Sequence, residues 1–185
     1  MKRNKIPAEG KQRRKGRKAL LWIGCGAAAL LLILLAVYMT GAVGRTVGET
    51  VKLKDVTDFY YTYSTSTNPP LFQRYRFYLE ESGKPVFYHE KREGDHWPLR
   101  EGDVTVSGTK ELTGEQWAAF FDCLRGGTVR KRQESAEAGG RGPWMYLYWR
   151  GDHGKIQEFT FPSLEARRAF EDMCLAFVEE WAHAA

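Results

Sequence analysis

The fold class is decided by residues 72–92, FQRYRFYLEESGKPVFYHEKR. Residues 72–81 and 85–92 are two β-prone runs, and Ser82-Gly83-Lys84 between them contains a glycine that can supply the positive φ of a tight turn. This pattern predicts an antiparallel β-hairpin. An aromatic run at residues 59–63 predicts one more strand before the hairpin.

An amphipathic helix is predicted to follow the first hairpin. Thr113 and Gln116 stand at the spacing of a capping box, and Gly126 is typical of the position just past a helix end. Between them, apolar residues recur at helical spacing: Trp117, Phe120, Phe121 and Leu124.

A similar order of elements returns in the second half of the chain. A strand is expected near residues 127–133, followed by an exposed loop at 134–143 that is rich in Gly, Ala and charged residues. Residues 144–150 and 155–161 then predict a second hairpin, with its turn at 151–154.

The last helix is expected after Pro162, with Ser163 as its N-cap. Its core face is predicted from helical spacing: Phe170, Met173, Cys174, Phe177 and Trp181. The order ββ(β)α-(β)ββα predicts an α+β domain in which two helices pack on one face of an antiparallel sheet. The parallel between Tyr78–Tyr88 and Tyr148–Glu158 favours a diverged internal repeat.

Charge is distributed unevenly along the chain. The formal net charge is +5, but residues 1–18 hold nine Lys or Arg and one acid, which gives this tail a charge of +8. The remaining nineteen basic and twenty-two acidic residues give −3. Because nucleic-acid binding depends on basic patches, this balance argues against nucleic acid as a partner of the folded domain.

A transmembrane helix is predicted at residues 19–40, which carry no charge. At a rise of about 1.5 Å per residue, this segment spans roughly 33 Å, enough to cross the lipid bilayer. The positive-inside rule places the basic flank in the cytoplasm. The expected order is a basic cytoplasmic tail at 1–18, the spanning helix at 19–40, a juxtamembrane linker at 41–55 and an extracytoplasmic α+β domain at 56–185.

Two processing alternatives exist for the apolar segment. Ala42 and Gly44 are small residues that could precede a signal-peptidase cut, but the apolar run exceeds the usual signal-peptide core of about 7–15 residues. Ile23-Gly24-Cys25 resembles the end of a lipidation box, but the longer apolar stretch follows Cys25 and does not precede it. Residues 19–40 are therefore expected to remain uncleaved and to serve as a membrane anchor.

Familiar catalytic and metal-binding motifs are absent from the sequence. Asp95-His96, with His89 and Glu90 nearby, could orient an imidazole for proton transfer, but a histidine on a connecting loop is more often a structural or surface residue. His89, His96 and His153 lack the short spacing of metal ligands. We therefore expect no catalytic residue, no metal and no cofactor.

Cys123 and Cys174 lie on the two predicted helices. Outside the cytoplasm they could form a disulfide if their Cα atoms came within about 7 Å. The alternative is that both are small buried hydrophobic residues, as the position of Cys174 on its helical face indicates.

One face of the predicted sheet combines aromatic and arginine side chains, because alternation separates them from the apolar positions of each hairpin. These candidate binding residues are Arg74, Arg76, Tyr78, Trp144, Tyr146 and Tyr148. Such side chains anchor interfaces and stack on sugar rings or other planar groups. The alternative is cross-strand packing without a ligand, worth about 0.2–1 kcal/mol per pair.

Residues 126–130, GGTVR, and 142–150, GPWMYLYWR, resemble stretches of uncharacterised, single-pass membrane-anchored proteins of Gram-positive bacteria. The resemblance implies location in a bacterial plasma membrane. It carries no activity, cofactor or functional residue.

The sequence therefore predicts a non-catalytic, membrane-tethered interaction module. Its aromatic and arginine face, with the loop around Arg141, is expected to contact an envelope polymer or a membrane-protein partner. The alternatives are an extracytoplasmic enzyme of unknown type and a membrane-complex assembly factor that acts through residues 19–40. For the latter, Gly24 and Ala28 have a spacing that lets two membrane helices approach closely.

Overall fold

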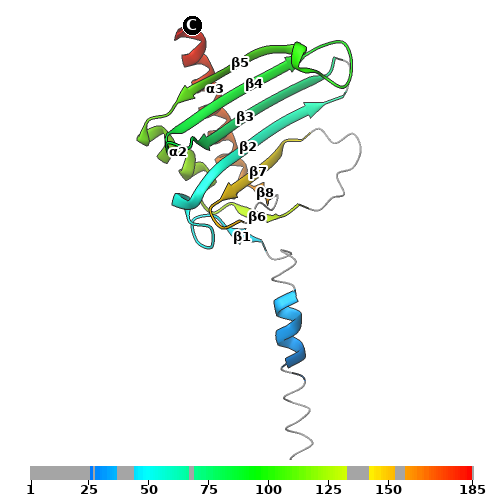
Figure 1. Ribbon diagram of the computed structural model, residues 1–185, viewed down its shortest axis with the longest axis vertical. Helices are drawn as coiled ribbons and strands as arrows, with labels where there is room; N and C mark the ends of the chain where they lie inside the picture. The colour runs from blue at the N-terminus through cyan, green and yellow to red at the C-terminus, as the bar shows by residue number, and fades with distance from the viewer. Residues whose placement is uncertain are drawn as a thin grey trace, which may run out of the picture. The chain divides into compact units, whose positions relative to one another are not determined.

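Figure 1 shows the computed structural model of the chain. The structure describes Gly26 and residues 28–36, 44–66, 69–132, 142–152 and 157–184, with side chains as far as residue 180. The chain divides into two compact units, Met1–Val43 and Gly44–Ala185.

The described part of the N-terminal unit is a short helical segment at residues 28–36. Its apolar side chains Leu30–Leu35 are 52–67% exposed. Within the ranges given above, no helix is long and apolar enough to cross a membrane. Most of the segment 19–40, for which a transmembrane helix is predicted, lies outside these ranges.

An eight-stranded sheet forms the body of the Gly44–Ala185 unit. Its strand order is β1-β6-β8-β7-β2-β3-β4-β5, and all neighbouring strands are antiparallel. The strands are β1 (Arg45–Thr46), β2 (Val56–Thr65), β3 (Leu71–Leu79), β4 (Pro85–Glu93), β5 (Val104–Glu111), β6 (Thr128–Lys131), β7 (Trp144–Trp149) and β8 (Gln157–Thr160). The predicted α+β class with an antiparallel sheet is confirmed.

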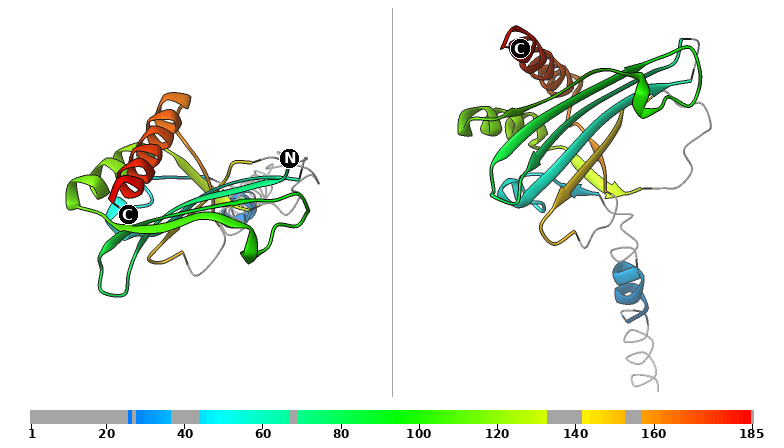
Figure 2. Two further views of the ribbon diagram at one scale, coloured as in Figure 1. Left: turned by 90° about the horizontal axis from the view of Figure 1, so that it is seen from above. Right: turned by 45° about the horizontal axis from the view of Figure 1, so that its top comes forward.

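One longer helix follows the strands of each half of the unit. These helices are α2 (Gly114–Leu124) after β5 and α3 (Leu164–Ala184) after β8. Both lie on the same side of the sheet, which Figure 2 shows most clearly in its left view. Two short 3₁₀ helices, η1 (Leu53–Asp55) and η2 (Glu101–Asp103), precede β2 and β5.

Aromatic side chains fill the space between the sheet and the helices. Phe77 of β3 stacks on Phe120 of α2 at 4.2 Å between ring centroids, and Phe59 of β2 meets Phe170 of α3 at 5.4 Å. All four rings are fully buried. Burial of each stabilises the fold by about 1.5–3 kcal/mol relative to exposure.

The helix ends follow the predicted capping chemistry. The N–H of Gln116 donates to Oγ1 of Thr113 at 3.2 Å, and the N–H of Thr113 donates to Oε1 of Gln116 at 3.0 Å, which closes the capping box of α2. The N–H of Ala166 donates to Oγ of Ser163 at 3.1 Å at the start of α3. Both capping predictions are confirmed.

The sequence predicts that the domain starts at Val56, but the folded unit Gly44–Ala185 begins earlier in the chain. Arg45–Thr46 pairs with β6, and Val47 and Val51 are buried in the core, with exposed fractions of 0% and 1%. Residues 44–55 therefore belong to the folded unit rather than to a linker. Short apolar residues that bury against a distant strand leave no periodic pattern from which they could be predicted.

The edge strand β5 also has no counterpart among the predicted elements. Its sequence, VTVSGTKE, has few large apolar residues, and most of its side chains are exposed or half-buried. An edge strand with little buried surface shows weak hydrophobic alternation, so its pairing with β4 becomes visible only in the structure.

Candidate binding surface

The six candidate binding residues lie on one side of the sheet, facing away from α2 and α3. On the opposite side, Phe59 pairs with Phe77 and Leu147, and all three are fully buried among the core residues. Because strand side chains alternate, the positions next to these three point away from the helices. We call this uncovered side, which lies in front of the helices in Figure 1, the open face.

Strand β2 brings the candidates of the two hairpins together, because it lies between β3 and β7. Its open-face residues Asp58, Tyr60 and Thr62 are the centres of three cross-strand rows. The rows are Tyr78–Asp58–Tyr148, Arg76–Tyr60–Tyr146 and Arg74–Thr62–Trp144. The candidate residues therefore form one continuous surface, and all of them are half-buried.

Arg76 is held at the middle of this surface by Asp58. Its Nε donates to Oδ1 of Asp58 at 3.0 Å and its Nη2 donates to Oδ2 at 2.6 Å. The guanidinium also lies 4.4 Å from the ring centroid of Tyr78 and 4.9 Å from that of Tyr60. Burial and the neighbouring Asp58 carboxylate raise the pKa of Tyr60, which keeps its hydroxyl protonated.

A second charged pair lies on β4. Glu90 is 6% exposed, accepts a 2.6 Å hydrogen bond from the Tyr88 hydroxyl and forms an ion pair with Arg92. Burial would raise the pKa of Glu90, but the hydrogen bonds from Tyr88 and Arg92, together with the charges of Arg92 and Arg74, outweigh it and lower that pKa. Burial, together with the Glu90 carboxylate, raises the pKa of Tyr88 to about 12.

Arg74 differs from both of these arginines. Among the described residues, no carboxylate lies within ion-pair distance of its guanidinium, and its buried Nε has no hydrogen-bond partner. The guanidinium lies 5.0 Å from the ring centroid of Phe72 and 5.8 Å from that of Tyr60. The charge of Arg74 thus lies over aromatic rings, and it interacts with the Glu90 carboxylate opposite it without forming an ion pair.

The indole of Trp144 is packed against the backbone that precedes it. A Cβ placed on Gly142 would lie 2.8 Å from the Trp144 ring and 3.1 Å from the carbonyl oxygen of Thr62. Gly142 has a φ of 73°, which a larger residue adopts only with strain. The absence of a side chain at Gly142 therefore allows the Trp144 ring to pack beside β2.

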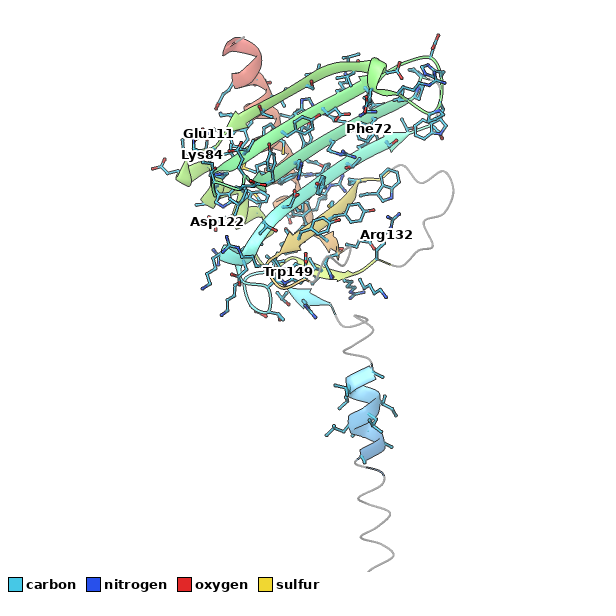
Figure 3. All side chains as sticks on the ribbon, in the orientation of Figure 1. Phe72, Lys84, Glu111, Asp122, Arg132 and Trp149 are labelled. Carbon is cyan, nitrogen blue, oxygen red and sulfur yellow. The ribbon has the colours of Figure 1, made fainter. Side chains whose placement is uncertain are left out.

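The remaining aromatic residues of β7 also contact their neighbours. Tyr148 meets Tyr60 edge-to-face at 5.9 Å, and Arg132 lies 5.7 Å from the ring centroid of Tyr146. Figure 3 labels Arg132 beside β7 and Phe72 on β3, at two margins of the open face. Arg141, in the loop that was expected to contribute, lies outside the described residues.

The structure divides the candidate polar cluster between two places, His89 with Glu90 on β4 and His96 with Asp95 on the loop after it. His89 is buried on the helix-covered face, where its ring stacks on Tyr75 at 4.9 Å, whereas the adjacent Glu90 points to the open face. Burial lowers the pKa of His89, so its ring is neutral near pH 7. His96 lies on the exposed loop after β4, 3.3 Å from Asp95.

No group of metal-ligating side chains occurs among the residues that the structure describes. His153 lies outside these residues.

Cys123 of α2 and Cys174 of α3 are both free thiols in this structure. Cys174 is fully buried, and its burial raises the thiol pKa well above the usual value, with a smaller effect from Cys123. Burial also raises the pKa of Cys123. A disulfide between them stays one of the two alternatives that the sequence leaves open.

The open face extends beyond the six residues that were predicted. Asp58, Tyr60, Phe72 and Glu90 belong to it as well, because they contact or pair with the candidates. Arg92 also belongs to it, because it pairs with Phe72 and forms an ion pair with Glu90. Alternation within residues 59–63 could have placed Tyr60 on this face, but the pairing of β2 with β7 joins distant segments and has no local sequence pattern.

Comparisons with known proteins add no assignment, since no family model, no curated protein and no solved structure matches the chain.

Proposed function

We propose that this protein is a membrane-anchored, non-catalytic binding module whose open face binds an envelope polymer or a membrane-protein partner. The observation that carries the proposal is the alignment of six aromatic and arginine residues in three rows on an uncovered sheet face. Tyr, Trp and Arg are enriched among the few hot-spot residues of an interface, whose truncation costs about 2 kcal/mol or more.

The side chains of the open face are fixed before a ligand arrives, which supports this role. Asp58 holds Arg76 through two hydrogen bonds, and Tyr148 packs against Tyr60. Ordering a flexible side chain on binding costs about 0.5–1.5 kcal/mol. A surface that is ordered by its own contacts avoids much of this cost.

The proposed anchor is the apolar segment at residues 19–40. Leu30–Leu35 are more than half exposed within their own unit, and six consecutive apolar side chains of this kind are poorly suited to water. Burial in lipid would remove that surface from water. The proposed topology places the basic residues 1–18 in the cytoplasm and Gly44–Ala185 on the outer side of a bacterial plasma membrane.

The proposal is tested by recovering envelope material with the purified full-length protein in detergent micelles. The binding variant changes Tyr78, Tyr146 and Tyr148 to Ser. A matched control changes Leu164 and Leu175 of α3 to Ser, because these side chains are 55% and 51% exposed and lie away from the open face. Circular dichroism and thermal unfolding establish that each variant is folded.

We expect the wild-type protein and the Leu164/Leu175 variant to retain the same component, and the tyrosine variant to lose it. Retention of the same component by all three folded proteins would show that the open face is not the binding surface. No retained component from either the soluble or the membrane fraction would contradict a binding role.

A further inference from the structure

The charges on the open face of β2, β3, β4 and β7 do not cancel. Three guanidinium groups stand against two carboxylates, and each carboxylate is already paired, Asp58 with Arg76 and Glu90 with Arg92. Arg74 is the cation in excess. Its guanidinium lies over the rings of Phe72 and Tyr60.

Glu90 lies directly opposite Arg74 on β4 and β3, and the charge of Arg74 helps to lower the pKa of the Glu90 carboxyl. The Glu90 carboxylate receives hydrogen bonds from Tyr88 and Arg92, and no ion pair joins it to Arg74 within the described residues. An anion from outside the chain would therefore meet a guanidinium that is not in direct ion-pair contact with a carboxylate of the described residues. Guanidinium groups bind such anions through paired, charge-assisted hydrogen bonds.

The cross-strand row that contains Arg74 also has the shortest central side chain. Thr62 separates Arg74 from Trp144, whereas the centres of the other two rows are Tyr60 and the ion-paired Asp58. Two strand spacings of about 4.8 Å put Arg74 and Trp144 roughly 10 Å apart along this row. The Thr62 hydroxyl between them can both donate and accept a hydrogen bond.

We infer that the row Arg74–Thr62–Trp144 binds an acidic sugar unit, with the pyranose ring stacked on the Trp144 indole and the anionic group on the Arg74 guanidinium. The inference rests on the proposed function, and it specifies the ligand class of the same face. A flat ring surface, a hydroxyl and a cation without an ion pair among the described residues match the apolar face, the hydroxyl groups and the charge of such a unit.

The test measures binding of tetragalacturonate to the full-length protein in detergent micelles by isothermal titration calorimetry. The uncharged methyl ester of the same oligosaccharide and inorganic phosphate are the comparison ligands. Arg74→Gln removes the cation, and Trp144→Leu removes the ring. Arg168→Gln, on the exposed surface of α3, is the matched control.

We expect the wild-type protein and Arg168→Gln to prefer the acid over its ester by about 10- to 100-fold, the range of a charge-assisted hydrogen bond. Arg74→Gln should bind the acid and the ester equally. Trp144→Leu should weaken both while it keeps the preference for the acid.

Three results would overturn the inference: equal binding of the acid and the ester by the wild type, an unchanged preference in folded Arg74→Gln, or no binding of tetragalacturonate. Binding of inorganic phosphate as tight as binding of tetragalacturonate would show an anion site without a sugar site. This result would also overturn the inference. The proposed function stands in each case if the tyrosine variant still loses envelope material that the wild type retains. The proposed function fails separately if the wild type and the tyrosine variant both retain that envelope material.

Discussion

Gly127→Ala gives a sharp test of the packing between β6 and β8. A Cβ at this position would lie 2.5 Å from two ring carbons of Phe159 and 2.9 Å from the carbonyl oxygen of Thr160. Carbon atoms in ordinary contact are about 3.5–4.0 Å apart, so the overlap is about 1 Å.

The ring of Phe159 has little room to yield. It is 1% exposed and packs edge-to-face on Phe59 at 5.3 Å and on Phe161 at 5.0 Å. Overpacking of a well-packed core typically costs about 1–3 kcal/mol, and the overlap with a backbone oxygen places this substitution toward the upper end. With a urea m-value of about 2 kcal/mol/M, the unfolding midpoint should fall by about 1 M.

The measurement is urea unfolding of Gly44–Ala185, followed by tryptophan fluorescence and by circular dichroism. This unit contains its own core, since the buried core cluster of the described residues runs from Val47 to Phe177. Gly114→Ala is the matched control, because a Cβ there meets nothing within 4 Å at the start of α2. We expect the control to be neutral, or to stabilise the unit by about 0.4–1 kcal/mol through reduced entropy of the unfolded chain. A Gly127→Ala midpoint within about 0.2 M of the wild type would refute the close approach of Gly127 to Phe159.

Three further outcomes follow from individual contacts. Asp58→Asn should lower the free energy of unfolding by about 1–2 kcal/mol in urea titrations, because it removes the carboxylate that holds the partly exposed Arg76. An unchanged unfolding midpoint would show that this ion pair adds no stability. Burial lowers the pKa of His89 from 6.5, so the unfolded chain binds the proton more readily and stability should fall as the pH is lowered from 7 to 5. His89→Phe should flatten this part of the pH–stability curve. A curve of unchanged slope would contradict the lowered pKa of His89. In native Gly44–Ala185, a thiol reagent should modify the half-buried Cys123 before the fully buried Cys174. Intact mass before and after reduction distinguishes two free thiols from the alternative, a Cys123–Cys174 disulfide. Equal reactivity of both thiols would contradict the burial of Cys174.

Local patterns in the sequence predict the elements whose buried surface is large. The first hairpin forms with Leu79 opposite Pro85, and its turn glycine, Gly83, has a φ of 84°. The residues on the buried face of α2 were predicted from helical spacing, and Phe120 and Leu124 are indeed fully buried. In each case, the residues that form the predictive pattern lie within a few positions of one another along the chain.

The relations between distant segments could not be predicted in this way. Nothing local in β2 indicates that β7, and not a neighbouring strand in the sequence, will occupy its second edge. The contrast between Arg74 and Arg76 has the same origin. Both arginines alternate correctly onto the open face, but only the cross-strand register puts Asp58 within reach of Arg76 and leaves Arg74 without an ion pair among the described residues.

The central position of β2 links the stability of the fold to the proposed binding role. Phe59 on this strand is fully buried against both helices, while the adjacent Tyr60 contacts Arg76 and Tyr148 on the open face. Because successive side chains of one strand are attached to the same backbone, the packing of Phe59 restricts the position of Tyr60. The aromatic core beneath the sheet therefore also acts as the support that keeps the binding side chains in fixed rows, and a substitution that loosens the core should weaken ligand binding before it unfolds the unit.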